Sequence, residues 1–312
     1  MKHAVLILAH DNIPVVKTAM KILDDARFTF YLLIDKKSKY SAKEFIPKLN
    51  NSLCKVLKPI CVNWGGYSSI NAELRLIEAA LKDKQEILHF LQGADLPLKT
   101  PEQIDCFCRK NNNIFIDVGS APDLWVTYKV LCKHPLVEFK SYRNNRLLKM
   151  TDHVIAHLQK PFIKKSSWYD KLYSGSALWS IPNDFANYVL SCENEIKKLY
   201  KNSLAADEVF IHTICMNSMY KERVSEYKNC RLIDWKHREK NSPKTFTIDD
   251  IKDIDIGIEK EDMLFARKFN ANRDNEVIEY VYNNVNIKKN REGKYEDPVY
   301  KCRASSRTDT SI

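Results

Sequence analysis

The chain has little glycine and lacks the motifs that many nucleotide-binding and hydrolytic enzymes carry. Only 7 of its 312 residues are glycine, which excludes a glycine-rich repeat protein. Neither a G-x-x-x-x-G-K-S/T phosphate loop nor a G-x-G-x-x-G dinucleotide fingerprint occurs. H-E-x-x-H and the G-x-S-x-G nucleophile elbow are also missing, so the sequence gives no support to zinc-peptidase or serine-hydrolase chemistry.

Long apolar runs and regular cysteine patterns are absent too. No segment has the roughly 18 apolar residues of a membrane helix. The N-terminal run from Ala4 to Ala9 is shorter than a signal-peptide core and meets His10 at once. The nine cysteines are irregularly spaced, with one C-x-C at Cys106 and Cys108, which indicates reduced thiols rather than zinc ligands or disulfides. We therefore expect a cytoplasmic protein, with peripheral contact at the inner face of the membrane as an option.

What the chain does have is positive charge. Its formal net charge is +10, which favours anionic partners such as phosphates, nucleotides, nucleic acid or anionic lipid. Lysine and arginine are spread along the chain without a basic arm or an aromatic-basic sheet motif. Nucleic acid is therefore not the expected partner, and a generally basic surface remains the simplest alternative.

Short apolar runs alternate with helical patterns over the first 120 residues. Such continuous runs are typical of strands covered on both faces. We expect strands at 5–8, 28–34, 53–57, 87–91 and 114–117. Helical patterns lie between them: one opens at Pro14, one carries Ile70, Leu74, Ile77 and Leu81 on one face, and one covers 101–110. This alternation predicts an α/β protein with a parallel sheet.

The polar groups that follow these strands should share one edge of the sheet. In such sheets ligands bind beyond the carboxyl ends of the strands. Trp64 precedes the paired glycines; we favour packing in the core for it over stacking on a ligand, and we expect the glycines to form a tight turn. The candidate residues at this edge are His10, Asp35, Gly65, Gly66 and Asp95.

The second half of the chain is less regular. Residues 121–172 are aromatic and basic, as in an insertion across a site or a surface excursion. We expect strands at 174–181 and 231–235, a helix opened by Pro182, another after the "AADE" stretch, and a last helix at 273–285. The interpretation is one catalytic domain over 1–286, with a donor half at 1–120, an acceptor half at 121–286, and a polar tail at 287–312.

Metal-binding carboxylates are scarce where a nucleotide-sugar enzyme would need them. Such enzymes commonly use D-x-D and a divalent cation, but the strand at 87–91 is followed only by Asp95 in "GADLP". The D-x-D at Asp253 and Asp255 falls in a helical stretch and reads as a solvated face. Without a metal, side-chain cations must neutralise a leaving diphosphate. The candidates are Lys244, Arg267 and Lys268, each of which could equally be an ordinary surface cation.

The stretch "AADEVFIHT" at 205–213 places two carboxylates side by side. Asp207 is a good helix N-cap, and Glu208 in the first turn would suit the helix dipole. A structural role and a catalytic role can both hold for this pair, if Asp207 caps the helix and Glu208 points into a cleft.

Taken in order, eight blocks resemble the core-2/I-branching β-1,6-N-acetylglucosaminyltransferases of glycosyltransferase family 14, which includes the peptide O-xylosyltransferases. The blocks span about 3–285 and are "HAVLILAHDNIP", "LLIDKKS", "VNWGGYSSINAELRLIEAAL", "HFLQGADLPLKT", "YSGSALWSI", "AADEVFIHT", "RLIDW" and "FARKF". The resemblance implies a GT-A fold, a Rossmann-like mixed sheet flanked by helices. It also implies a nucleotide-sugar donor, inversion at the anomeric carbon and no metal or other cofactor.

The resemblance also assigns roles to individual residues. It implies that Glu208 is the catalytic base, that Asp35 contacts the nucleotide and that Lys268 contacts the diphosphate. Lys244 stands nearest to a second basic position that is Arg in animal members; a lysine there supplies charge without a forked pair of hydrogen bonds. Trp235 matches a platform under the acceptor sugar. His237 replaces a tyrosine there, which leaves the acceptor open.

The function expected from this resemblance is transfer of GlcNAc from UDP-GlcNAc to a glycan or lipid-linked glycan during bacterial surface polysaccharide synthesis. The animal members' disulfide framework and membrane anchor have no counterpart in the sequence, which fits a bacterial relative. A xylosyltransferase using UDP-xylose, and a nucleotide-binding protein without catalysis, are the alternatives.

Overall fold

The structure is a computed structural model that describes residues 1–119, 124–163, 169, 171–240 and 242–292. Its centre is a five-stranded sheet in the order β3-β2-β1-β4-β6. The strands are β1 (His3–Ala9), β2 (Phe28–Ile34), β3 (Leu53–Val56), β4 (Ile87–Gln92) and β6 (Ser180–Pro182). The first four are parallel and β6 runs antiparallel to β4, so the sheet is mixed.

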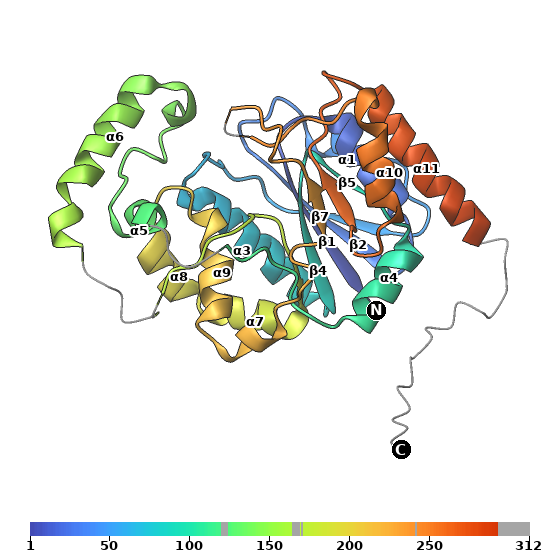
Figure 1. The fold of residues 1–312 in the computed structure, drawn as a ribbon, viewed down its shortest axis with the longest axis horizontal. Coiled ribbons are helices and arrows are strands. Elements are labelled where there is room, and N and C mark those ends of the chain that lie inside the picture. The colour runs from blue at the N-terminus through green and yellow to red at the C-terminus, as the bar shows by residue number, and fades with distance from the viewer. Residues whose placement is uncertain (120–123, 164–168, 170, 241, 293–312) are drawn as a thin grey trace, which may run out of the picture.

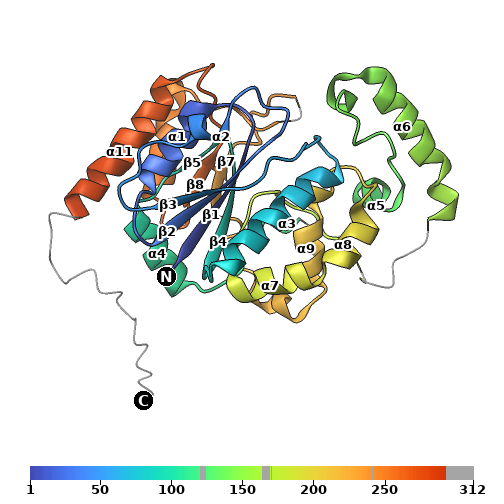
Figure 2. The ribbon, with the colours of Figure 1, turned by 180° about the vertical axis from the view of Figure 1, so that it is seen from behind.

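Helices cover both faces of this sheet (Figures 1 and 2). One face packs against α1 (Ile13–Ile22), α2 (Ala42–Phe45), α4 (Pro101–Lys110), α10 (Ile251–Glu259) and α11 (Glu276–Glu292). The other packs against α3 (Tyr67–Lys82), α7 (Asn183–Ser191), α8 (Glu193–Tyr200) and α9 (Phe210–Met216). Successive residues of β1 enter opposite cores, which is why the strand is apolar throughout.

A second sheet of three short strands extends this core in the order β5-β8-β7. It joins β5 (Asp95–Pro97), β7 (Arg231–Ile233) and β8 (Phe265–Arg267). Because β5 follows β4 at once, this sheet brings the late segments 231–237 and 265–269 to the carboxyl end of β4.

Residues 124–163 form a lobe at one end of the molecule, opposite α11 (Figures 1 and 2), which we call the α6 lobe. Its elements are α5 (Leu124–Leu131), η1 (Tyr142–Asn144), α6 (Arg146–Leu158) and η2 (Lys160–Phe162). A buried carboxylate holds it together, since Asp152 Oδ2 lies 2.8 Å from His134 Nδ1 and accepts a 3.0 Å hydrogen bond from the Tyr142 hydroxyl.

The α6 lobe is fastened to the segment before the "AADE" stretch by three hydrogen bonds. The amide of Leu204 donates to the carbonyl of Lys129 at 2.8 Å, and the amide of His134 donates to the carbonyl of Asn202 at 2.7 Å. The Ser203 hydroxyl donates to the carbonyl of Val130 at 2.9 Å.

Several expectations about single elements need correction. The expected strand at 114–117 is reduced to isolated bridges, because Ile114 pairs parallel with Val224 while Phe115 pairs antiparallel with Ser180. The expected strand at 174–181 shrinks to β6, because the amide of Gly175 donates to the carbonyl of Glu208 instead of a neighbouring strand. The last helix runs on to 292, and the tail at 293–312 lies outside the described residues.

One helix is confirmed where the sequence predicts it. The helix expected at 101–110 is α4, and Thr100 caps it by accepting from the amide of Gln103. The eight cysteines among the described residues are all free thiols. No helix in the described part of the chain is long and apolar enough to cross a membrane.

Candidate functional site

The carboxyl ends of β1 and β4 meet at the point where the strand order reverses. Chain order runs outward from β1 to β3 on one side, and β4 lies on the other side of β1. Asn12 spans this point, since its side-chain amide donates to the carbonyls of Gly93 and Phe269, each at 2.9 Å. Such a reversal is where open α/β sheets bind ligands. The late chain therefore returns to the edge of the sheet at which we expect a ligand to bind.

His10 and Asp35 line the β1–β2 side of this edge. His10 is exposed with its Nε2 3.2 Å from Asp11 Oδ2, and this hydrogen bond raises the pKa of His10. Asp35 Oδ1 accepts from the amides of Lys37 at 2.9 Å and Val62 at 3.2 Å. Both residues lie where the sequence places them, and Asp35 also holds the loop after β3 against β2.

Asp95 and Arg267 face each other across the small sheet. Arg267 donates from one nitrogen to Asp95 Oδ1 and from the other to Gln92 Oε1, each at 2.6 Å. Asp95 is buried, so the guanidinium supplies the partner that a buried carboxylate needs. Because this pair neutralises itself, Arg267 has little charge to offer a ligand.

Lys268 is the cation that is least neutralised among the three predicted ones. Its ammonium donates to the Ser242 hydroxyl at 2.7 Å and lies 4.0 Å from Glu239 Oε2. Burial lowers the pKa of Lys268; Glu239 opposes this, while the positive charges of Arg267, Arg273 and Arg143 lower it further. An anion bound among these cations would relieve their repulsion. Lys244, by contrast, is already paired with Asp250 at 2.6 Å.

Arg143 joins this cationic group from the α6 lobe. Its guanidinium lies 5.8 Å from the ring centre of Trp64 and acts electrostatically on His10 and Lys268. The expectation that Trp64 packs in the core is wrong, because the side chain is 48% exposed and Lys149 also approaches its ring at 5.8 Å. The exposed ring is held by cation–π contact with the lobe.

The paired glycines link this edge to the "AADE" turn. Gly65 has φ of 76°, and its carbonyl accepts a 2.7 Å hydrogen bond from the amide of Ala205. A side chain at Gly66 would run into the carboxylate of Glu138, whose Oε1 accepts from the amide of Ser68 at 2.8 Å. Glu138 thus occupies the start of α3.

The "AADE" stretch forms a short 3₁₀ turn, η3 (Ala206–Glu208), ahead of α9. Asp207 was expected to cap the helix, but it lies inside the turn, and neither η3 nor α9 begins with a side-chain cap. Ala205 takes a left-handed conformation with φ of 52°, which turns the chain so that both carboxylates come before α9 rather than at its first position.

Glu208 presents a carboxylate that is half exposed and loosely paired. Its side chain is 50% exposed, and its Oε2 lies 3.7 Å from the ammonium of Lys129. The surrounding protein raises the pKa of Glu208, and the charge of Lys129 opposes that rise. A carboxylate with a raised pKa that solvent can reach is suited to accept a proton from a ligand hydroxyl.

Asp207 and Glu73 are coupled electrostatically to Glu208, because the charge of Glu208 acts on Asp207 and that of Asp207 acts on Glu73. Burial and the neighbouring charge of Glu208 raise the pKa of Asp207 to about 7. Glu73 is fully buried in α3, where the Trp179 indole donates to its Oε2 at 2.9 Å, and burial with the charge of Asp207 raises its pKa well above the usual range. Burial therefore favours the protonated form of Glu73.

Trp235 and His237 follow β7. Trp235 is 54% exposed, which leaves its ring accessible. His237 lies with its Nδ1 2.8 Å from Asp234 Oδ2, and its backbone amide donates to Asp234 Oδ1 at 2.9 Å. Both residues lie on a surface loop held by Asp234. The backbone carbonyl of Asp234 also accepts a hydrogen bond from the amide of Lys244.

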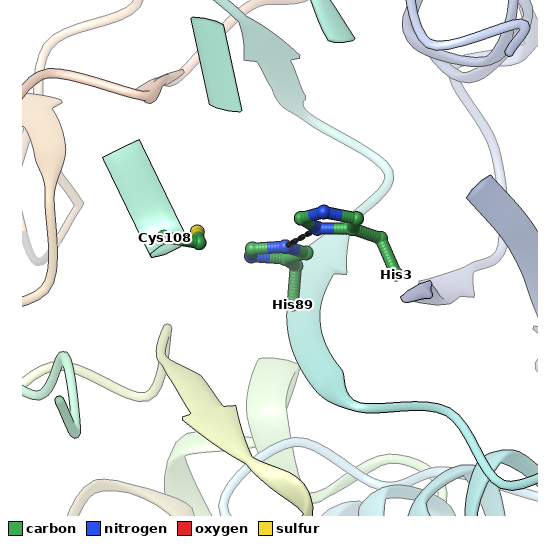
Figure 3. Close-up of side chains that lie close together, drawn as sticks. All are labelled: His3, His89 and Cys108. Atoms are coloured by element: carbon green, nitrogen blue, oxygen red, sulfur yellow. Dashed lines mark hydrogen bonds between the residues drawn. The ribbon is translucent and has the colours of Figure 1, made fainter. Parts of the chain in front are cut away.

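One group of three metal-ligand side chains lies together within the described residues: His3, His89 and Cys108 (Figure 3). The His3 Nδ1 and His89 Nε2 atoms are hydrogen-bonded at 3.1 Å, while the other ring nitrogens meet Asp105 and Ser180. All four ring nitrogens therefore have partners. This cluster is a buried polar network, and it lies at the opposite end of β1 from His10.

Three residues of this region were missed by the sequence reasoning: Arg143, Lys129 and Glu73. Arg143 and Lys129 belong to the basic stretch at 121–172. Its irregular pattern did not indicate where these residues would lie relative to the sheet. Glu73 carried a usable signal, since a glutamate three residues after Ile70 and four before Ile77 falls on the buried face of α3.

The mixed sheet flanked by helices, with its polar edge at the strand reversal, is consistent with a GT-A-like glycosyltransferase fold. The sequence model of the family described as "Branch: Core-2/I-Branching enzyme" matches residues 4–257. The chain therefore belongs to the core-2/I-branching enzyme family, a family of glycosyltransferases that use a nucleotide-sugar donor and a glycan acceptor. A search of curated proteins found no match.

Proposed function

We propose that the chain is an inverting, metal-independent glycosyltransferase that moves GlcNAc from UDP-GlcNAc to a hydroxyl group of a glycan acceptor. The observation that carries this proposal is the environment of Glu208. Its carboxylate is half exposed, 3.7 Å from its nearest charged partner, and its pKa is raised. Inversion needs one displacement and one base, and this single carboxylate meets the requirement.

In the proposed step, Glu208 takes the proton of the acceptor hydroxyl as its oxygen attacks the anomeric carbon. The new C1–O bond forms on one face of the sugar while the C1–O bond to phosphate breaks on the other. UDP leaves with the electron pair of the broken bond. The proton resides on Glu208 until solvent, which reaches its half-exposed side chain, removes it.

We assign to Lys268 and Arg143 the role of neutralising the charge that develops on the leaving diphosphate. Both act on one region, since the charge of Arg143 is felt at Lys268. Arg267 and Lys244 are occupied by Asp95 and Asp250, so they serve better as supports of the pocket wall than as ligands. Fixed cations placed where charge develops stabilise the transition state without reorganisation.

The remaining predicted residues are assigned to the two substrates. His10 and Asp35, beside the strand reversal, are placed at the nucleotide, with Gly65 and Gly66 shaping the loop next to it. Exposed Trp235 offers a flat apolar surface on which a sugar ring can stack, with His237 beside it. Asp207 is assigned to binding of the acceptor. A bacterial surface polysaccharide or its lipid-linked precursor is the proposed acceptor, in the cytoplasm, and the free thiols support a reducing compartment.

A donor screen that follows UDP release tests this function. Wild type and Glu208→Gln are compared with and without EDTA on UDP-GlcNAc, UDP-xylose and other UDP-sugars. We expect turnover with UDP-GlcNAc that survives EDTA and falls about 10²- to 10⁴-fold in Glu208→Gln. The matched control is Glu195→Gln, on the exposed face of α8, which should retain full activity.

Three outcomes would contradict parts of the proposal. Loss of turnover on chelation, restored by a divalent cation, would contradict metal independence. A fully active Glu208→Gln would remove the base assignment. Turnover with UDP-xylose in place of UDP-GlcNAc would change the donor while leaving the mechanism intact.

A further inference from the structure

Helix α6 carries an apolar stripe that faces solvent. Leu147, Met150, Val154 and Leu158 recur at helical spacing on one side, and each is at least 54% exposed. Phe162, 78% exposed, continues the stripe beyond the helix. The opposite side of α6 buries Asp152 and Ala156 against the rest of the lobe. Exposed apolar stripes of this length mark interaction surfaces.

The exposed charges of the α6 lobe have one sign. The described lobe contains seven lysines and arginines and two acidic residues, Glu138 and Asp152. Asp152 is buried, and Glu138 is hydrogen-bonded to Ser68 and Asn63 at the start of α3. The exposed charge of the lobe is therefore cationic, carried among others by Lys133, Lys140, Arg146 and Lys160.

We propose that this face of α6 docks on an anionic lipid membrane. An apolar stripe bordered by lysine and arginine is the pattern of helices that lie in the membrane interface, where apolar side chains enter the acyl boundary and cations meet lipid phosphates. With 13 residues, α6 is about 20 Å long and lies at the outer edge of the molecule (Figure 1). A flat surface can reach it without meeting α11.

Charge argues against a second copy of the chain as the occupant. A twofold dimer through α6 would set the same cationic residues of both copies against each other. A lipid surface brings negative charge and needs no matching shape. Docking would also set the ligand-binding edge close to the bilayer, because Arg143 and Lys149 of the lobe contact Trp64 beside that edge.

Vesicle sedimentation with the full chain tests the proposal independently of any reaction. The probes are phosphatidylcholine vesicles with and without phosphatidylglycerol. We expect binding to the anionic vesicles, reduced at least about tenfold by the double variant Leu147→Glu/Leu158→Glu. Arg146→Gln with Lys140→Gln should weaken it on the order of fivefold for each charge removed. Met219→Glu is the matched control, since Met219 is 84% exposed on η4 (Met219–Arg223), outside the lobe.

Circular dichroism confirms that each variant is folded. Equal binding to neutral and anionic vesicles, or binding that the double variant leaves unchanged, overturns the proposal. A chain that binds neither kind of vesicle also overturns it. A dimer in solution that the double variant dissociates overturns it in favour of a second copy.

Discussion

The backbone amide of Gly175 donates a 2.9 Å hydrogen bond to the carbonyl oxygen of Glu208. A Cβ atom at this glycine would lie 1.6 Å from the carbonyl oxygen of Asp117 and 2.6 Å from Nε2 of His212. The "YSGSALW" segment therefore packs against the η3 turn through its backbone, with no side chain at the point of contact. The chemistry proposed for Glu208 depends on a position where only glycine fits.

Gly175→Ala should destabilise the protein and lower transfer activity together. The added methyl overlaps backbone, so the segment must move and lose its hydrogen bond to Glu208. We expect about 1–3 kcal/mol less free energy of unfolding, measured in urea. Gly93→Ala is the control, because its Cβ would lie no closer than 3.2 Å to the Ala9 methyl and 3.5 Å to the carbonyl oxygen of Asp11, without overlap. Equal losses in the two variants would argue against a special role for the Gly175 contact.

Lys129→Met should shift the pH dependence of the reaction. The proposed base must be ionised, and the ammonium of Lys129 opposes the rise that burial imposes on the pKa of Glu208. Without Lys129 the pKa of Glu208 rises, so the acidic limb of kcat/KM should move to higher pH. Lys133→Met, an exposed change in the same lobe, should leave the limb in place. If the acidic limb of Lys129→Met stays where it is in wild type, the group that titrates in the kcat/KM profile is not Glu208.

Arg143→Gln and Lys268→Gln should each weaken UDP binding by about tenfold or more, because each removes a charge-assisted contact to the diphosphate. Lys244→Gln should have a smaller effect, since its ammonium is held by Asp250. Isothermal titration with UDP at two salt concentrations measures both the affinity and its electrostatic part. Arg146→Gln is the control, as an exposed arginine on α6. A response of Arg143→Gln no larger than that of this control would remove it from the site.

Stability should fall as pH drops below about 6.5, the ordinary pKa of histidine in the unfolded chain. Burial lowers the pKa of His3 and His89, and that of His212 to about 4. Below pH 6.5 these histidines therefore bind protons in the unfolded chain but not in the folded protein, which favours unfolding. For His212 the loss develops between pH 6.5 and about 4 and amounts to roughly 3 kcal/mol.

His212→Leu isolates this effect. Both ring nitrogens of His212 are buried without a hydrogen-bond partner among the described residues, so an apolar side chain of similar size should fit at no polar cost. We expect a variant that is as stable at pH 7.5 and loses less stability by pH 5, measured by urea unfolding. His157→Leu, at an exposed position on α6, should keep the wild-type slope. A slope unchanged by His212→Leu would place the sensitivity at His3 and His89.

The parts of the fold set by local pattern could be predicted from the sequence. The strands β1 and β2 are continuous apolar runs, and α4 carries its own proline and capping threonine, so their positions follow from neighbouring residues. The reversed direction of β6 could not be predicted in this way. It depends on pairing with β4 about ninety residues earlier, as in the bond from the Phe90 amide to the Trp179 carbonyl.

In the candidate site, too, features set by neighbouring residues could be predicted, and features set by contacts between distant segments could not. Glu208 could be proposed from the sequence because two adjacent carboxylates stand out in the chain and the ordered blocks around them resemble a family. The capping role of Asp207 was wrong because the left-handed Ala205 and the Gly65 carbonyl, distant in sequence, shape the turn. Arg143 and Trp64 meet only when the α6 lobe is docked, and no local pattern reports that docking.

The three hydrogen bonds between the α6 lobe and residues 202–204 bear on how this chain can be engineered. The lobe looks like an appendage, yet its attachments end next to the turn that carries Glu208. Excising or exchanging residues 124–163 as a cassette would leave the Leu204 amide and the Asn202 carbonyl without their partners. Exchanging the lobe between relatives would therefore require the 202–208 segment to be transplanted with it.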